Sequence, residues 1–367
     1  MPRTELRVLF SLLVLLPLGG QAAPGVEIQV LGSGGPRPSA QASAGTLVLL
    51  DGAPRILVDA GQGTLLRAGE ERVDLSALDA LLLTHLHVDH SVEVPAFVIA
   101  RSLDSSAPVH LRVFGPPGSA LFPSTVQWSE RLFGTSGLYR YVRQFGAETR
   151  VLATNVAPPP GKATRLLELD GAVVTGRALH HGDAPAVGYR IERAGRSVVF
   201  AGDIDRSGLP SLEALARGAD LLVVSCAVLD PPASPEALYA RHTGPRLLAE
   251  TAARAGVGRL LLTHLPPAVL SRRSDVEQSV HAAFKGGLLV AADGLRATVE
   301  AAPVLSTDGA GGCRSNADCG RGKVCVSCGK ESSCVAGCST LADCGPGQIC
   351  AQVQCIRCPC PAQCRTP

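Results

Sequence analysis

The segment His85-Leu86-His87-Val88-Asp89-His90 places three histidines and one aspartate within six residues, directly behind the apolar run 78–83. The whole chain of 367 residues has nine histidines, so this cluster is far denser than the composition alone produces. Imidazole nitrogens and carboxylate oxygens are the ligands that a borderline-soft divalent ion such as zinc selects. One ion rarely takes four ligands from so short a loop. We therefore expect His85 and His87 to serve one metal ion, and Asp89 and His90 to face a second.

Short apolar segments broken by glycine and aspartate continue from residue 26 to about residue 300. Their periodicity and turn signals predict a mixture of strands and helices, with a hairpin around Asp51-Gly52. The strands expected are 26–31, 46–50, 55–58, 80–83, 109–114, 165–169, 172–179, 187–192, 197–201, 221–224 and 259–262, and the helices are 63–70, 211–217, 245–255 and 275–284. This mixture predicts a layered α/β domain over residues 24–305.

Further ligand candidates follow three of the expected strands. His181 follows the strand over 172–179, Asp203 the strand over 197–201, and His264 the strand over 259–262. A single polar residue after a strand is more often a turn residue. Because the loop at 85–90 already requires partners, these three side chains complete two coordination spheres. His180 directly precedes His181 and is the alternative to it.

Residues 1–23 have the composition of a secretory signal peptide. Arg3 and Arg7 precede an apolar stretch over 8–18, and small residues follow, with cleavage expected after Ala22 or Ala23. The apolar stretch is shorter than the roughly 20 residues of a spanning helix, and no later segment reaches that length without charges. We therefore expect an exported protein, secreted or periplasmic, with no membrane span after cleavage. Basic residues are mainly arginine, which indicates a GC-rich bacterial genome.

Cysteine use divides the chain in two. Residues 24–312 contain only Cys226, which we expect to be a buried core thiol, whereas the last 55 residues contain twelve cysteines. A dense, even set in an exported chain predicts a disulfide framework. The alternative is zinc binding, because Cys325 and Cys328, and also Cys355 and Cys358, have the spacing of metal ligands. The expected disulfide cysteines, with pairing open, are Cys313, Cys319, Cys325, Cys328, Cys334, Cys338, Cys344, Cys350, Cys355, Cys358, Cys360 and Cys364.

The cysteine-rich tail over 313–367 contains an internal repeat, in which residues 313–325 match residues 338–350. Two such copies bury little core, so covalent cross-links have to supply their stability. The repeat has no catalytic constellation, and we expect a spacer or surface-retention module. A linker of glycine, serine and aspartate over 306–312 separates the tail from the larger domain.

Several short motifs follow one another in a fixed order between residues 26 and 300. They are Leu31-Gly32-Ser33-Gly34-Gly35-Pro36, Val58-Asp59-Ala60-Gly61-Gln62-Gly63-Thr64, Thr84-His85-Leu86-His87-Val88-Asp89-His90, Phe114-Gly115-Pro116-Pro117-Gly118, Gly188-Tyr189-Arg190, Gly202-Asp203, His242-Thr243 and Thr263-His264. This series resembles the metallo-β-lactamase superfamily, and within it the ribonuclease Z and arylsulfatase-like branch. The resemblance implies an αββα sandwich with two zinc ions at one rim, Mn²⁺ or Fe²⁺ being alternatives.

The resemblance also implies how the ligands are shared. It places His85, His87 and His181 on the first ion and Asp89, His90 and His264 on the second, with Asp203 bridging both. His181 is preferred over His180 because related sequences place this ligand seven or eight residues before the tyrosine of the Gly-Tyr-Arg motif.

Water held between two such ions ionises near neutral pH and becomes a nucleophile. Asp89 is expected to accept its proton while remaining a ligand. His242 matches a ribonuclease Z motif and is expected to position the substrate or to protonate the leaving group. The alternative for His242 is a surface residue that caps a helix.

The expected activity is hydrolysis of a small phosphodiester or sulfate ester. Ribonuclease Z enzymes of the common type carry a long basic insertion between the motifs at 188–190 and 202–203, and this insertion is missing here. Ser225-Cys226 also stands where those enzymes usually have a glutamate. With a formal net charge of +2, the composition shows no electrostatic footprint for nucleic acid, so no nucleic acid partner is expected. Lactone or β-lactam hydrolysis, or a non-catalytic secreted binding protein, are the alternatives; the oligomeric state stays open, a homodimer included.

The segment 121–145 contains nearly half of the aromatic residues in a chain poor in them. We expect this segment to form a flap over an apolar or aromatic leaving group. Packing of these side chains on the sandwich is the alternative. The six aromatic residues are Phe122, Trp128, Phe133, Tyr139, Tyr141 and Phe145.

We predict that the twelve tail cysteines are oxidised. Mass spectrometry of the denatured, non-reduced protein after alkylation should then show one modified thiol, Cys226, because only that cysteine lies outside the framework. Cys226→Ser is the control, and it should leave no alkylated residue. Several alkylated tail cysteines, or zinc bound to the isolated tail, would contradict the prediction.

Overall fold

The computed structural model describes residues 25–300, with the exception of Phe145, and four short strands between residues 323 and 365. The chain divides into two units, Met1–Ala302 and Pro303–Pro367. The expected signal peptide over 1–23 and the linker over 306–312 lie outside the described residues, as do the side chains of the tail cysteines. In the part of the chain that is described, no helix has both the length and the apolar composition to cross a membrane.

Two seven-stranded sheets form the centre of the larger unit. The first sheet has the order β14-β1-β2-β3-β4-β5-β6, in which β3 to β6 are parallel and the others antiparallel. Its strands are β1 (Val26–Gly32), β2 (Gly45–Leu50), β3 (Ala53–Val58), β4 (Ala80–Leu82), β5 (Val109–Gly115), β6 (Thr149–Asn155) and β14 (Arg296–Thr298).

The second sheet has the order β13-β12-β11-β10-β9-β8-β7. Strands β10 to β13 are parallel, and β7 to β10 pair antiparallel as successive hairpins. The strands are β7 (Ala163–Leu169), β8 (Ala172–His181), β9 (Ala184–Arg193), β10 (Arg196–Phe200), β11 (Leu221–Ser225), β12 (Arg259–Thr263) and β13 (Gly287–Val290).

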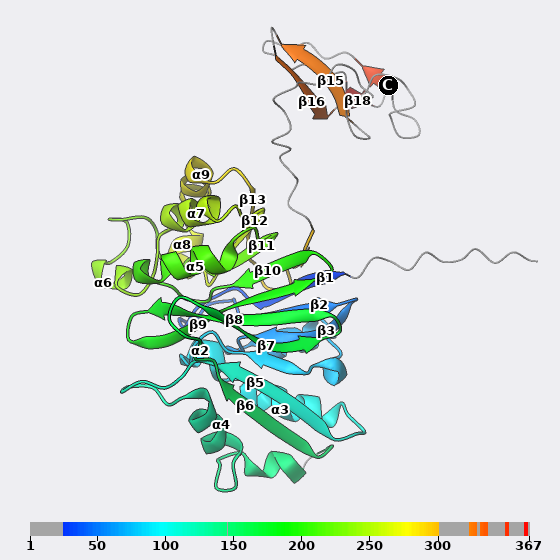
Figure 1. Cartoon of the computed structure of the whole chain (residues 1–367), viewed down its shortest axis with the longest axis vertical. Helices are drawn as coiled ribbons and strands as arrows, with labels where there is room; N and C mark the ends of the chain where they lie inside the picture. The colour runs from blue at the N-terminus through cyan, green and yellow to red at the C-terminus, as the bar shows by residue number, and fades with distance from the viewer. Residues whose placement is uncertain are drawn as a thin grey trace, which may run out of the picture. The chain divides into compact units, whose positions relative to one another are not determined.

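Helices cover the outer face of each sheet, so the unit has four layers. In Figure 1, α5, α7 and α9 lie on one side of the two sheets and α3 on the other. The expected αββα sandwich is therefore confirmed. The helices are α1 (Thr64–Glu70), η1 (Leu75–Ala77), α2 (Val88–Ser91), α3 (Val94–Leu103), α4 (Thr125–Phe133), η2 (Arg140–Gln144), η3 (Arg206–Gly208), α5 (Leu209–Ala216), α6 (Glu236–Tyr239), α7 (Pro245–Arg254), α8 (Pro267–Leu270) and α9 (Arg273–Ala283).

The central strands are apolar on both faces because each face is covered. In β2, Val48 packs in the core between the sheets, whereas Leu47 and Leu49 pack under the helices of the first sheet. A strand buried on both faces shows a continuous apolar run instead of an alternating pattern. Cys226 follows β11, is fully buried under α5 and α7, and has a pKa that burial raises to about 12. The expectation of a core thiol is confirmed.

Both sheets end their parallel strands at one edge of the sandwich. Strands β3 and β4 run in the same direction, and so do β10, β11 and β12. The carboxyl ends of parallel strands meet at the same edge of a sheet, and loops at that edge collect functional groups. The loops after β3, β4, β10 and β12 therefore lie close to one another.

A buried tyrosine joins the two sheets beside this edge. The Tyr189 side chain comes from β9 of the second sheet, and its hydroxyl donates to the backbone oxygen of Leu83, 2.7 Å away, at the end of β4 in the first. The backbone oxygen of Phe114 lies 3.2 Å from the same hydroxyl. Tyr189 is fully buried, so water cannot replace its hydroxyl at the Leu83 oxygen, whereas the Phe114 oxygen also accepts from the backbone nitrogen of Leu83, 2.7 Å away. This contact fixes the end of β4, where the histidine-rich loop begins.

Three strands of the sandwich were not expected from the sequence. Strand β6 lies at an edge of the first sheet, and about half of its residues face solvent. Strands β13 and β14 also lie at edges and have four and three residues. Strand β14 lacks the continuous apolar run that identifies a central strand, and in β6 and β13 this run has only three residues, 151–153 and 288–290, none of which is buried.

The smaller unit contains two antiparallel strand pairs in its described part. Strands β15 (Lys323–Cys328) and β16 (Glu331–Ala336) pair with Cys325 opposite Cys334. Strands β17 (Ile349–Ala351) and β18 (Gln363–Arg365) pair with Cys350 opposite Cys364. The disulfide framework itself stays a prediction.

We predict that Tyr189→Phe destabilises the larger unit by about 1–3 kcal/mol, because the buried oxygen of Leu83 loses its donor. The free energy of unfolding of the full-length protein, measured by chemical denaturation, should fall by that amount. Tyr139→Phe is the matched control, because the ring of Tyr139 packs against the core while its hydroxyl makes none of the described hydrogen bonds, and it should change stability little. Equal stability of the two variants would show that the hydroxyl does not hold the sheets together.

Candidate metal centre

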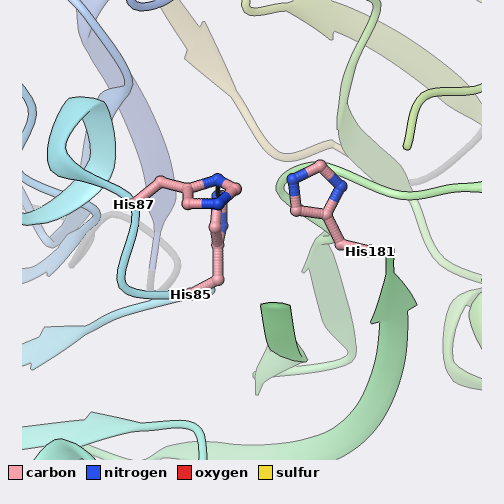
Figure 2. Close-up of side chains that lie close together, drawn as sticks. All are labelled: His85, His87 and His181. Carbon is pink, nitrogen blue, oxygen red and sulfur yellow. Dashed lines mark hydrogen bonds between the residues drawn. The ribbon is translucent and has the colours of Figure 1, made fainter. Parts of the chain in front are cut away.

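The histidine-rich loop begins where β4 ends and passes directly into the short helix α2. His87 is the N-cap of α2 and has an extended backbone, while Asp89 and His90 lie in its single turn and are buried. Figure 2 shows the rings of His85 and His87, from this loop, facing His181 at the end of β8. The His85 Nε2 and His87 Nδ1 atoms are 2.9 Å apart. The change from strand to helix therefore turns four polar side chains inward.

Asp59 fixes the position of this loop from the neighbouring strand. Its carboxylate accepts hydrogen bonds from the backbone nitrogen of Thr84, 2.7 Å away, and from the Thr84 hydroxyl, 2.8 Å away. The Nδ1 atom of His90 lies 2.8 Å from the same carboxylate, so Nε2 of His90 faces the site. Asp59 adopts a left-handed backbone with φ of 58°, which is uncommon for residues other than glycine. Sequence reasoning quoted Asp59 as part of a motif but gave it no role.

The second sheet supplies the other three side chains. His181 ends β8, and its Nδ1 atom donates to the backbone oxygen of Arg241 over 2.8 Å, which leaves Nε2 directed into the site. Asp203 follows β10 after Gly202. His264 follows β12 in a left-handed conformation with φ of 56°. Strained backbone of this kind persists where the surroundings determine it strongly, as at a functional site.

The seven expected ligands lie in overlapping groups, and the ligand atoms of each group are within 4.8 Å of one another. The Asp203 carboxylate faces both sides, with Oδ2 at 3.6 Å from His181 Nε2 and Oδ1 at 3.6 Å from His264 Nε2. The groups are His85, His87 and His181; His85, His90 and Asp203; Asp89, His90 and His264; and His181, Asp203 and His242.

The spacing of these atoms and their lack of partners fit metal ions. Atoms about 2.1 Å from a tetrahedral zinc ion lie about 3.4 Å from one another. His90 Nε2 is 3.7 Å from oxygens of both Asp89 and Asp203, which is too long for a hydrogen bond but close to that spacing. Among the described residues, His90 Nε2 and Asp203 Oδ1 are buried without a hydrogen-bond partner. A buried polar atom without a partner in the protein is one that a bound ion or water molecule can satisfy.

Two glycines let the site close tightly. A Cβ atom at Gly202, whose φ is 62°, would lie 2.5 Å from the Thr84 hydroxyl oxygen. A Cβ atom at Gly35 would lie 2.7 Å from Cε1 of His264. Both distances are shorter than side chains tolerate, so only glycine fits at these positions. The Gly-Gly and Gly-Asp motifs of the sequence are thus packing requirements of the site.

Burial and neighbouring charges set the ionisation of the groups. Burial lowers the pKa of His85 well below its usual value and keeps the ring neutral. Burial opposes ionisation of Asp203, but the surrounding histidines, His264 first, outweigh it and hold the pKa of Asp203 well below its usual value. Burial also opposes the charge on His90, yet Asp59 and Asp203 raise its pKa to about 9. A metal ion that binds here has to displace the proton of His90.

A pocket of about 240 Å³ opens onto these groups and is lined by ligand candidates and by Arg37, Leu238, Arg241 and His242, among others. The His242 side chain is only 15% exposed, and its Nδ1 atom lies 3.8 Å from Asp203 Oδ2. Its ring therefore belongs to the pocket, although its backbone nitrogen donates to Leu238 at the end of α6. Burial lowers the pKa of His242 to about 4.

His180 takes a different position from His181. Successive side chains of a strand point to opposite faces, and the His180 side chain is 55% exposed and bonds to the carboxylate of Asp205. Asp205 also accepts from the backbone nitrogen of Gly182, so the pair fastens the end of β8 to the segment before η3. The structure thus places His181, and not His180, among the clustered groups.

The aromatic flap expected over 121–145 is largely wrong. Phe133 is buried, and Trp128 and Tyr139 pack against the core under the first sheet. Phe122 alone among the described aromatic residues of this segment makes a ring contact with the site, with its centroid 5.5 Å from that of His87. The amphipathic helix α4 explains this, because its apolar face covers the sheet.

Residues 54–265 match a family described as the beta-lactamase superfamily domain. A ribonuclease Z of Mycobacterium marinum is 34% identical over 275 residues, which cover 71% of this chain and 94% of the relative. A ribonuclease Z of Mycobacterium bovis is 35% identical over 257 residues, with 66% and 87% covered.

Solved structures share the fold. The metallo-beta-lactamase fold protein YhfI of Bacillus subtilis has a TM-score of 0.59 at 22% identity, with 75% of this chain and 100% of that one covered. The short form of human tRNase Z has a TM-score of 0.59 at 20% identity, with 75% and 99% covered.

The expectation that nucleic acid plays no part is wrong, because the curated relatives are ribonucleases by name. That expectation rested on a missing insertion, on net charge and on export. None of these concerns the pocket beside the clustered groups.

The ordered motifs, the αββα sandwich and the clustered histidines and aspartates agree with the matched family. Members of the branch that includes ribonuclease Z are metallo-hydrolases of the phosphodiesterase type. The chain belongs to the metallo-β-lactamase superfamily, and within it to the ribonuclease Z branch.

Proposed function

We propose that the larger unit is a dinuclear, zinc-dependent phosphodiesterase that hydrolyses a phosphodiester bond in RNA. The observation that carries this proposal is the clustering of seven ligand side chains from both sheets, five of which line one pocket. Five imidazoles and two carboxylates form a donor set that suits zinc. The ribonuclease Z relatives support the choice of a phosphodiester as the bond that is cleaved.

The donor groups divide naturally into two sites. His85, His87 and His181 would hold one ion, and Asp89, His90 and His264 the other. Asp203 would bridge them, since its two oxygens face histidines of the two different groups. Bound there, the ions would lower the pKa of a water molecule and neutralise charge on the attacked phosphoryl group.

Asp89 is placed to take the proton of the attacking water. Its Oδ2 atom lies 3.1 Å from His264 Nε2, and the carboxylate is buried beside the pocket. Burial opposes its ionisation, but the hydrogen bond from His264 and the charge of His90 outweigh burial and lower its pKa. The ionised carboxylate is the form that accepts a proton.

His242 is placed to act on the substrate itself. It lies on the pocket wall next to Asp203 and is the one member of the clustered histidines that the two proposed coordination spheres do not use. A neutral imidazole donates from one nitrogen and accepts at the other. His242 would therefore hold an oxygen of the phosphoryl or leaving group by a hydrogen bond.

The connection between β9 and β10 bears on the shape of the substrate. Only Ala194 and Gly195 separate the two strands, and both have positive φ, as in a tight hairpin. No arm projects there to hold a folded RNA body, so binding has to come from the rim of the pocket. A flexible single strand is the substrate that such a rim accommodates. We also propose export of the protein, which the signal-peptide composition of residues 1–23 supports.

We predict about two equivalents of zinc-class ions per folded chain, because seven ligands exceed one tetrahedral site. Metal analysis of purified protein should show Asp203→Ala depleted in both ions and His264→Ala depleted mainly in one. His110→Ala is the control, since His110 lies exposed on β5, and it should keep both ions. One equivalent or none in active wild-type protein would refute the dinuclear proposal.

We predict that His242→Ala keeps both ions but loses about 10²–10⁴-fold in kcat, the usual contribution of a positioned acid–base group. Rates should be measured on bis(4-nitrophenyl) phosphate and on a short single-stranded RNA. His281→Ala, exposed on α9, is the control. An unchanged kcat in His242→Ala would contradict the role assigned to His242 but not the fold. Turnover of a lactone or cephalosporin by the wild type, with both phosphodiesters inert, defeats the proposed reaction.

A further inference from the structure

Two arginines line the pocket without belonging to the metal groups. Arg37 and Arg241 are both exposed, and both line the pocket of about 240 Å³ together with Asp89, His181 and His264. The carboxylates that line this pocket, Asp89 and Asp203, face the clustered histidines. The guanidinium groups at the rim are therefore available to a ligand.

Arg241 stands beside His181. Its backbone oxygen accepts the hydrogen bond from His181 Nδ1, so the residue is held at this wall. Its side chain passes over Gly182, where a Cβ atom would lie 3.0 Å from Cγ of Arg241. The carboxylate of Asp183 lies 4.0 Å from the guanidinium, and both side chains are more than half exposed. An ion pair this long and this exposed is weak and yields to a stronger anion.

Arg37 lines the same pocket as His264 and comes from the loop that packs against the His264 ring. It follows Gly35 and Pro36, and Gly35 packs against the His264 ring. The loop is anchored behind it, because the Ser43 hydroxyl donates to the backbone oxygen of Gly35 over 2.8 Å. Prolines on both sides of Arg37 fix the backbone direction of the loop. The fold therefore fixes the backbone of Arg37 relative to the site.

The two arginines come from segments that contact different histidines. The Arg241 backbone bonds to His181, which faces Oδ2 of Asp203, whereas the loop of Arg37 packs through Gly35 against His264, which faces Oδ1. Asp203 thus lies between the two walls. Both arginines line the pocket that opens onto these groups.

Resting on the proposed phosphodiesterase function, we infer that Arg37 and Arg241 each bind a phosphate that neighbours the scissile one. Guanidinium groups bind phosphate through paired, charge-assisted hydrogen bonds. A single diester carries one phosphate and leaves both arginines without a ligand. The pocket is therefore built for an oligonucleotide strand with a phosphate on each side of the cleaved bond, and the arginines set this preference.

The test compares two substrates across three variants. Bis(4-nitrophenyl) phosphate has one phosphate, and a single-stranded RNA tetranucleotide has three linkages. Arg37→Gln and Arg241→Gln should each lower kcat/KM on the tetranucleotide about ten-fold, mainly through KM, and lower kcat/KM on bis(4-nitrophenyl) phosphate much less. Arg150→Gln, on the exposed start of β6, is the matched control and should change neither.

A neutral linkage identifies the contact. A methylphosphonate linkage carries no charge. Replacing the linkages beside the cleaved bond by methylphosphonates should therefore lower kcat/KM of the wild type to the value of the two arginine variants. The fall of kcat/KM with salt on the tetranucleotide should also be shallower in each variant.

The outcomes separate the two levels of the argument. If the wild type cleaves neither phosphodiester, the proposed function fails and this inference fails with it. If the wild type cleaves both, but the arginine variants lose equally on both, the arginines support the fold or the metal groups and the inference alone is overturned. Full activity of both variants on the tetranucleotide overturns it as well.

Discussion

The carboxylate of Asp59 is the contact on which the metal centre depends. It accepts hydrogen bonds from the backbone nitrogen and the hydroxyl of Thr84, and the Nδ1 atom of His90 lies within hydrogen-bond distance of it. The carboxylate therefore fixes both the loop that follows β4 and the orientation of the His90 ring. Partners of this kind orient metal ligands in many sites and set their affinity. Asp59 is buried, which makes each of these bonds stronger than it would be in water.

Much of the site was predictable because its residues follow apolar strands. Strand ends can be read from a sequence, and histidines after several of them point to one edge of a parallel sheet. The role of Asp59 could not be read in this way, because an aspartate before Ala60-Gly61 looks like an ordinary turn residue. Its left-handed backbone is visible only in the structure. The signal was its place directly after β3, the strand next to β4.

Long-range packing limited the rest of the prediction. Trp128 and Leu132 are spaced for one face of a helix, and that pattern serves a core as well as a pocket. The edge strands β6, β13 and β14 carry too little buried surface to be recognised. The exclusion of nucleic acid failed for a different reason. It used the net charge of the whole chain, whereas a protein can bind phosphate through a few side chains at one rim, and Arg37 and Arg241 line such a rim here.

The division of the clustered groups between the two sheets has a consequence for how the protein matures. The first sheet contributes His85 to His90, whereas His181, Asp203 and His264 come from the second. During synthesis, neither sheet alone contains all seven ligand candidates. The group with His264 is assembled only after residue 264 has been made, when nearly three-quarters of the chain exists. The order of translation therefore keeps the centre incomplete until both sheets are present to pack against each other.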